Sequence, residues 1–164
     1  MKKIITILCS VIMAIALSGN YLIRDNEKNF NTQIYYVDHS MLRLIPVDYE
    51  IKSSTKQKAC EQIINKITEG EDYNRKIMRV VPDIKNGMKI NISNKTAYVD
   101  FSKEFTENIP ENKIHEILMI YSIVNSLTSV EGVDMVKFRF QGDERKEYIG
   151  GMDMRESFIP DYNI

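Results

Sequence analysis

Apolar and polar residues alternate on both sides of a turn between residues 88 and 105, where the chain reads MKINISNKTAYVDFSKEF. Apolar side chains occupy every second position on either side of the turn formers Asn94 and Lys95. This pattern predicts a β-hairpin with one apolar face. An isolated hairpin is only marginally stable in water, so a helix or further strands must cover that face. We therefore expect the rest of the chain to fold over this hairpin.

Further strands are predicted from short apolar or alternating runs that end in turn-forming residues. Pro46 lacks an N–H donor, so the strand that contains it should lie at a sheet edge or break there. Pro82 should end a short strand, and the pair Asn86-Gly87 suits a turn with positive φ. The predicted strands span residues 33–37, 42–51, 77–81, 136–140 and 147–149.

Two helices are predicted from apolar residues at spacings of three and four. Ser54, with Gln57 three residues later, forms a capping box that starts the first helix, and Gly70 provides its left-handed end. The second helix should start near Asn108 and run to about Thr128, with a broader apolar face and deeper burial. The expected buried positions are Cys60, Ile63, Ile64 and Ile67 in the first helix, and Ile114, Ile117, Leu118, Ile120, Tyr121, Ile123, Val124 and Leu127 in the second.

The order of these elements predicts an α+β fold, with a small, mostly antiparallel sheet and two helices packed on one face. The chain has 164 residues, 43% of them hydrophobic and 27% charged, which is the size and composition of one globular domain. We expect this domain at residues 33–164, after a short polar tether at residues 24–32. The net charge of -1 leaves no excess of cations for a phosphate backbone, so we expect no nucleic-acid partner.

The first 23 residues are predicted to be a signal peptide or a transmembrane anchor. Lys2 and Lys3 precede a run of roughly 20 uncharged residues, about the length that crosses a hydrocarbon core. We favour an uncleaved anchor, with the lysines in the cytoplasm and the domain on the extracytoplasmic side of the cell membrane. Asn20 stands where a lipoprotein carries its lipid-bearing cysteine, so no lipid is expected at that position.

No segment carries a complete catalytic or metal-binding motif. The run Asp38-His39-Ser40 has the residue types of a hydrolase triad, but consecutive residues cannot form a relay, and we interpret it as a turn. The pair His115-Glu116 lacks the second histidine of a zinc-protease helix. Asp100, Glu104 and Glu107 are interpreted as solvated charges. We expect no catalytic residue, no metal and no cofactor, and we expect Cys60 to behave as a small buried hydrophobe.

Aromatic residues on an open sheet face often mark a surface that binds a partner. Phe101, Phe138 and Phe140 fall on inward strand positions and are expected in the core. The candidate partner surface consists of Tyr35, Tyr36, Tyr98 and Tyr148.

Several short motifs, in this order, resemble the GerMN domain family over residues 33–159. They are INKITEG at the end of the first helix, VP followed by NG, the hairpin KINISNKTAYVDFSKEF, and the segment IYSIVNSLTSVEGVDMVKFRFQG. Glu71 departs from the family pattern, in which a proline often follows the glycine. The resemblance implies a fold similar to the ring-building modules of secretion and sporulation channels. It also implies a non-catalytic role at the outer face of the membrane, linked to sporulation or germination.

These observations lead to three hypotheses, of which we favour the first. The first is a membrane-tethered, non-enzymatic assembly domain whose partners are envelope or sporulation-channel proteins, in a homo- or hetero-oligomer. The second is a module that binds the cell wall or a small ligand through its exposed aromatic residues. The third, which we rank lowest, is an envelope hydrolase that uses Asp100 or Glu104.

Overall fold

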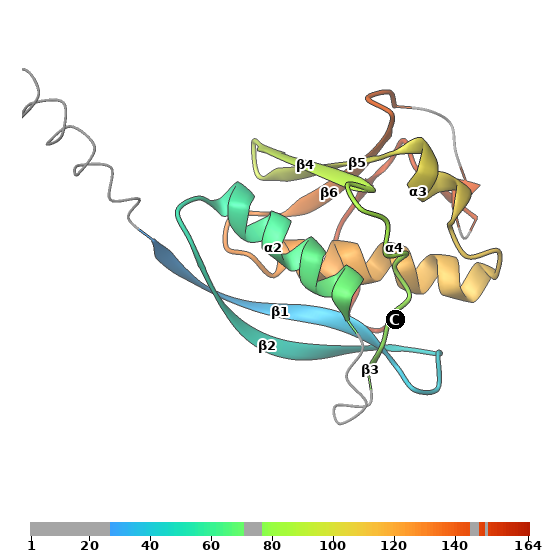
Figure 1. The fold of residues 1–164 in the computed structure, drawn as a ribbon, viewed down its shortest axis with the longest axis horizontal. Coiled ribbons are helices and arrows are strands. Elements are labelled where there is room, and N and C mark those ends of the chain that lie inside the picture. Colours follow the sequence, from blue (N-terminus) through green and yellow to red (C-terminus); the bar gives the residue numbers. More distant parts are fainter. Residues whose placement is uncertain (1–26, 71–76, 145–147, 150) are drawn as a thin grey trace, which may run out of the picture.

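Two β-sheets enclose a pair of long helices in this computed structural model, which describes residues 27–70, 77–144, 148–149 and 151–164 (Figure 1). Helix α2 (Lys56–Glu69) contacts strands of both sheets, and so does helix α4 (Lys113–Thr128). The apolar side chains from both sheets and both helices form a single core. The predicted N-terminal segment at residues 1–23 lies outside the described residues.

The strands form one three-stranded sheet, one four-stranded sheet and one two-stranded ladder. The first sheet is antiparallel and has the order β2 (Leu44–Ser53), β1 (Lys28–Asp38), β3 (Ile77–Met78). The second has the order β4 (Met88–Ser93), β5 (Thr96–Phe101), β6 (Met135–Phe140), β9 (Ser157–Phe158), and only its β5–β6 pair is parallel. The ladder pairs β7 (Tyr148–Ile149) with β8 (Met152–Asp153).

The predicted α+β class, with mostly antiparallel strands and two main helices, is confirmed, although the strands divide between two sheets. The hairpin is formed by β4 and β5, with Asn94 and Lys95 as its two turn residues, both at positive φ. Strand β2 lies at a sheet edge, as Pro46 predicted. Strand β1 begins at Lys28, so residues 28–32, expected in the tether, pair with β2.

Helix α2 has the predicted buried stripe, but both of its ends differ from the prediction. Thr55 is the N-cap in place of Ser54, and its hydroxyl accepts a hydrogen bond from the Lys58 N–H. Gly70 is not left-handed, because its φ is -60°. A Cβ atom at Gly70 would lie 2.5 Å from the buried ring of Tyr36. Glycine is therefore needed there for close packing.

Helix α4 starts later than predicted because a short helix, α3 (Lys103–Glu107), precedes it. Asn108, the predicted start, caps the end of α3, and Asn112 is the N-cap of α4. Ile114 lies in the first turn and is 50% exposed, so its predicted burial is wrong. From Leu118 to Leu127 the helix is buried at every position except the half-buried Tyr121, as expected for a helix between two sheets.

Candidate functional site: a polar groove on strand β1

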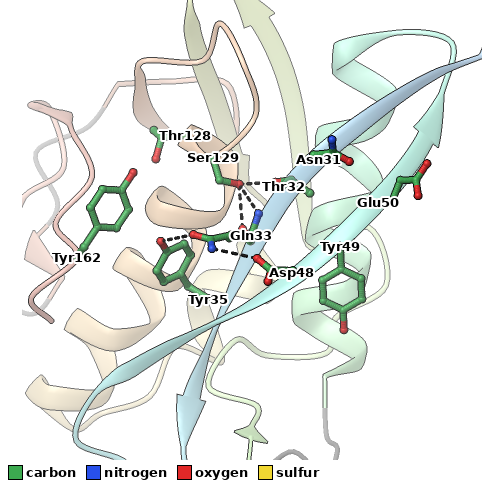
Figure 2. Close-up of a pocket in the computed structure, with 10 residues that line it drawn as sticks. All are labelled: Asn31, Thr32, Gln33, Tyr35, Asp48, Tyr49, Glu50, Thr128, Ser129 and Tyr162. Carbon is green, nitrogen blue, oxygen red and sulfur yellow. Dashed lines mark hydrogen bonds between the residues drawn. The ribbon is translucent and has the colours of Figure 1, made fainter.

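A groove of about 830 Å³ runs along β1 between β2, the C-terminal end of α4 and the C-terminal segment (Figure 2). Polar residues and tyrosines make up its walls. The lining residues are Asn31, Thr32, Gln33, Tyr35, Asp48, Tyr49, Glu50, Thr128, Ser129 and Tyr162.

The strand register explains why polar residues gather in this groove. Successive residues of a strand point to opposite faces, and paired residues of neighbouring strands share a face. Gln33 is paired with Asp48, and Asn31 with Glu50, so these four side chains lie on one face of the β1–β2 ribbon. The opposite face carries Ile34, which is fully buried, and packs against the helices.

Serine side chains of α4 and of its C-cap, Ser129, hold the edge of β1 beneath the groove. Strand β3 covers this edge only at the last two residues of β1. Further back, the Tyr35 N–H donates to Ser126 Oγ (2.8 Å), and Ser122 Oγ donates to the Tyr35 carbonyl (2.6 Å). Ser129 Oγ lies 3.1 Å from the Gln33 nitrogen and 2.9 Å from its carbonyl oxygen, and it also contacts the Thr32 hydroxyl. The helix thus takes the place of a neighbouring strand.

Another polar residue of α4 fixes the C-terminal segment that forms one wall. The side chain of Asn125, which is fully buried, donates to the Asp161 carbonyl (2.7 Å) and accepts from the Asp161 N–H (3.0 Å). The adjacent Tyr162 ring stacks on the Tyr35 ring, with centroids 5.6 Å apart, and is 59% exposed. The Leu44 N–H donates to the Ile164 carbonyl.

The groove is acidic and internally hydrogen-bonded. Gln33 donates to Asp48 (3.0 Å) and accepts from the Tyr35 hydroxyl (3.1 Å), which orients all three side chains. Burial raises the pKa of Tyr35, and the nearby Tyr162 and Asp48 raise it further, so its hydroxyl stays a donor. The lining includes the carboxylates of Asp48 and Glu50 and no lysine or arginine. Such a groove disfavours anionic ligands and suits neutral, hydrogen-bonding ones.

The four predicted surface tyrosines do not form one surface. Tyr35 and Tyr36 are adjacent in β1, so their side chains lie on opposite faces of the strand. Both side chains are buried. Tyr36 packs against α2, and its hydroxyl donates to the Lys66 carbonyl (3.3 Å). Tyr98 lies in the other sheet, half-buried under Arg139, whose guanidinium carbon is 4.4 Å from the ring centroid. The side chain of Tyr148 lies outside the described residues.

The residues considered for catalysis do not line the groove, and Asp38 and Asp100 serve local structure. Asp38 accepts from the Ser40 N–H and binds Arg43, as expected for a turn. Asp100 accepts from the Gly142 N–H, and Glu104 is exposed. Within the described ranges, no group of three histidine, cysteine or acidic side chains could hold a metal ion, and no helix is long and apolar enough to cross a membrane.

Sequence reasoning missed most of the groove. Gln33 and Asp48 come together only through the strand register, which the sequence does not show. Tyr162 lies in a segment without regular pattern. The small polar residues within α4, such as Ser126, were the available signal, because they interrupt an otherwise apolar helix that must be buried.

Solved structures share this fold. A predicted lipoprotein from Clostridium perfringens matches with a TM-score of 0.57 and 12% identity, over 81% of this chain and 87% of that one. The tandem GerMN domains of the sporulation protein GerM from Bacillus subtilis match with a TM-score of 0.54 and 21% identity, over 73% of this chain and 42% of that one. The first GerMN domain of the same protein matches with a TM-score of 0.50 and 22% identity, over 71% and 86%.

The two sheets, the enclosed helices and these structural matches define an α+β domain of the GerMN type. No curated protein matches the chain. Residues 33–146 match the Germane family, described as sporulation and spore germination, and the chain belongs to this family. The resemblance noted from the sequence is thereby confirmed.

Proposed function

We propose that this chain is a non-enzymatic interaction domain, tethered at the outer face of the cytoplasmic membrane, that assembles with envelope proteins during sporulation or germination. Family membership supports the cellular process. A predicted lipoprotein of the same fold supports an envelope location. The observation that carries the proposal is the polar groove on β1. The apolar side chains are packed in the core between the two sheets, whereas the polar side chains of the groove are open to a partner.

A cross-linking experiment in cells tests this proposal. A photoreactive amino acid is placed at Glu50, beside the groove, or at the exposed Lys85 as the control. We expect position 50 of the full chain to form an adduct with one envelope protein, in a sporulating or germinating culture and not in vegetative cells. Deleting the gene for that protein should then reproduce the defect caused by deleting this chain.

A catalytic activity would overturn the proposal. If the purified chain cleaved cell wall or peptide, and Asp100→Asn or His115→Ala abolished that cleavage, the domain would be an enzyme. Equal adducts from both positions, or adducts only in vegetative cells, would also contradict it.

The groove supports a second candidate function, the binding of a neutral polyhydroxylated ligand such as a glycan strand of the cell wall. Tyr162 offers an exposed ring on which a sugar can stack, and the amide of Gln33 and the carboxylate of Asp48 offer planar hydrogen-bonding groups beside it. Soluble peptidoglycan glycan fragments should bind the wild type and Tyr98→Ala equally, and Tyr162→Ala more weakly. Equal binding to all three chains would exclude this site.

A further inference from the structure

The edges of the two main sheets differ in how well they are protected. An unprotected edge strand exposes N–H and C=O groups that can pair with another strand, and proteins block such edges with proline, charge, short length or covering segments. Strands β3 and β9 are edges of only two residues each. The long edges in the described part of the chain are β2 and β4.

Strand β2 carries several of these blocks. Pro46 removes one N–H donor near the start of the strand. The Leu44 N–H is bonded to the Ile164 carbonyl, and the Lys52 carbonyl accepts from the side chain of Gln62 (3.1 Å). The carboxylates of Asp48 and Glu50 flank the remaining stretch, so a second acidic strand would be repelled.

Strand β4 has six residues and no proline, and its one charged residue is the exposed Lys89. Hydrogen-bonded and non-hydrogen-bonded residue pairs alternate along the antiparallel ladder between β4 and β5. The Ser102 N–H donates to the Gly87 carbonyl, so Gly87 and Ser102 form a hydrogen-bonded pair and the next pair, Met88 and Phe101, does not. The backbone groups of Met88, Ile90 and Ile92 therefore point away from β5. Their N–H and C=O groups have no partner among the described residues.

A groove with both apolar and polar lining residues lies beside the β4 edge. A cavity of about 400 Å³ lies between β4 and α2, lined by Ile64 of the helix and by Met88 and Ile90 of the strand. Glu61 and Lys89 line the same groove, so one surface presents both signs of charge. A second copy of this surface, turned by a two-fold rotation, can bring opposite charges together.

We propose that two copies of this chain pair through β4, in an antiparallel register with Ile90 of each copy on the two-fold axis. Met88 of one copy then lies opposite Ile92 of the other, and these apolar side chains extend the covered face of both sheets. On the outer face, Lys89 lies opposite Asn91, so no like charges oppose each other. The pairing joins two four-stranded sheets into one of eight strands. This inference deepens the proposed assembly function by naming the surface and the partner, a second copy of the chain.

Cysteine cross-linking in the full chain, in membranes, tests the register. In the proposed dimer, Lys89 and Asn91 of opposite copies form a non-hydrogen-bonded pair, whose Cα atoms lie about 4.5 Å apart, within the range that a disulfide spans. The double variant Lys89→Cys, Asn91→Cys should cross-link under mild oxidation, whereas either single variant should not. Cys9→Ser is present throughout, and the buried Cys60, whose pKa is raised to about 12, is inert.

Proline substitutions in the same double-cysteine background provide the matched control. Ile92→Pro removes a donor that points outward from β4, so the ladder with β5 is kept while pairing with a second copy is lost. Lys52→Pro removes the corresponding outward donor from β2. We expect Ile92→Pro to reduce the cross-linked dimer about tenfold and Lys52→Pro to leave it unchanged, with circular dichroism of each purified chain confirming the fold.

Three results would overturn the inference: no cross-link in the double variant, equal cross-linking of a single variant, or equal loss with both prolines while both stay folded. If the dimer fails in this way but the groove still captures an envelope protein, the proposed function stands and only the β4 pairing falls.

Discussion

The contact between Ser126 and β1 gives the sharpest test of how the groove is built. Ser126 is fully buried, and its Oγ is the partner of the Tyr35 N–H at 2.8 Å. Ser126→Ala removes this acceptor and leaves the N–H buried without a partner, because β3 does not reach that part of β1. An unsatisfied buried donor costs about 1–3 kcal/mol. We therefore expect the free energy of unfolding to fall by that amount.

Ser122→Ala provides an internal comparison. Ser122 donates to the carbonyl of the same residue, Tyr35, and a carbonyl that loses a partner is less often a serious defect than an N–H. We expect Ser122→Ala to destabilise the domain less than Ser126→Ala. The exposed Ser157→Ala serves as the control and should change the stability by less than about 0.5 kcal/mol.

Urea unfolding of residues 24–164, followed by circular dichroism, measures these effects. With m-values of about 1–3 kcal/mol/M, the midpoint for Ser126→Ala should fall by about 1 M at an unchanged slope. Amide exchange should also become faster at Tyr35 before other positions of β1. If Ser126→Ala were as stable as Ser157→Ala, with the Tyr35 amide equally protected, the helix would not be holding this edge.

Three further predictions concern other positions. Gly70→Ala should destabilise the domain by about 1–3 kcal/mol in the same assay, because the new methyl group meets the ring of Tyr36. Cys60, whose pKa burial raises to about 12, should resist alkylation at pH 8 in the folded chain and react once urea unfolds it. The hydrogen bond from Ser40 lowers the pKa of Asp38 in the folded chain. This hydrogen bond therefore stabilises the fold fully at pH values above the ordinary aspartate pKa, and its contribution is lost as the pH falls through the lowered pKa of Asp38. Ser40→Ala should raise that pKa in an NMR titration and remove stability at neutral pH but not in acid.

Local patterns in the sequence were sufficient for the elements but not for their arrangement. The β4–β5 hairpin and the strand β6 were predicted because alternation is a local property, and the burial of Phe101, Phe138 and Phe140 follows from it. The division into two sheets depends on which strands pair over long distances, and alternation says nothing about that. The broad apolar face of α4 nevertheless indicated that the helix is covered on two sides, because a helix covered on one side needs only a narrow stripe of apolar residues.

Tyr35, Tyr36 and Tyr98 do not form one exposed surface, for a reason that the sequence already contained. Tyr35 and Tyr36 are neighbours in one strand, so their side chains must point to opposite faces and cannot belong to one exposed patch. Tyr98 was placed in a different hairpin from both. The aromatic residue that does face solvent beside the groove, Tyr162, lies in a C-terminal segment that is positioned by Asn125 rather than by a pattern of its own.

Small polar residues inside α4 connect the stability of the domain with the shape of its groove. A buried helix between two sheets would be expected to carry only apolar residues, yet Ser122, Asn125 and Ser126 are all buried. Each forms a hydrogen bond with a backbone group that has no partner in a neighbouring strand. The serines bond to the edge of β1, and the asparagine bonds to the C-terminal segment. Because residues of both segments line the groove, substitutions of these buried residues should alter ligand or partner binding without replacing any residue that lines it. A binding defect in Asn125→Ala, with the lining side chains intact, is therefore expected from positioning alone.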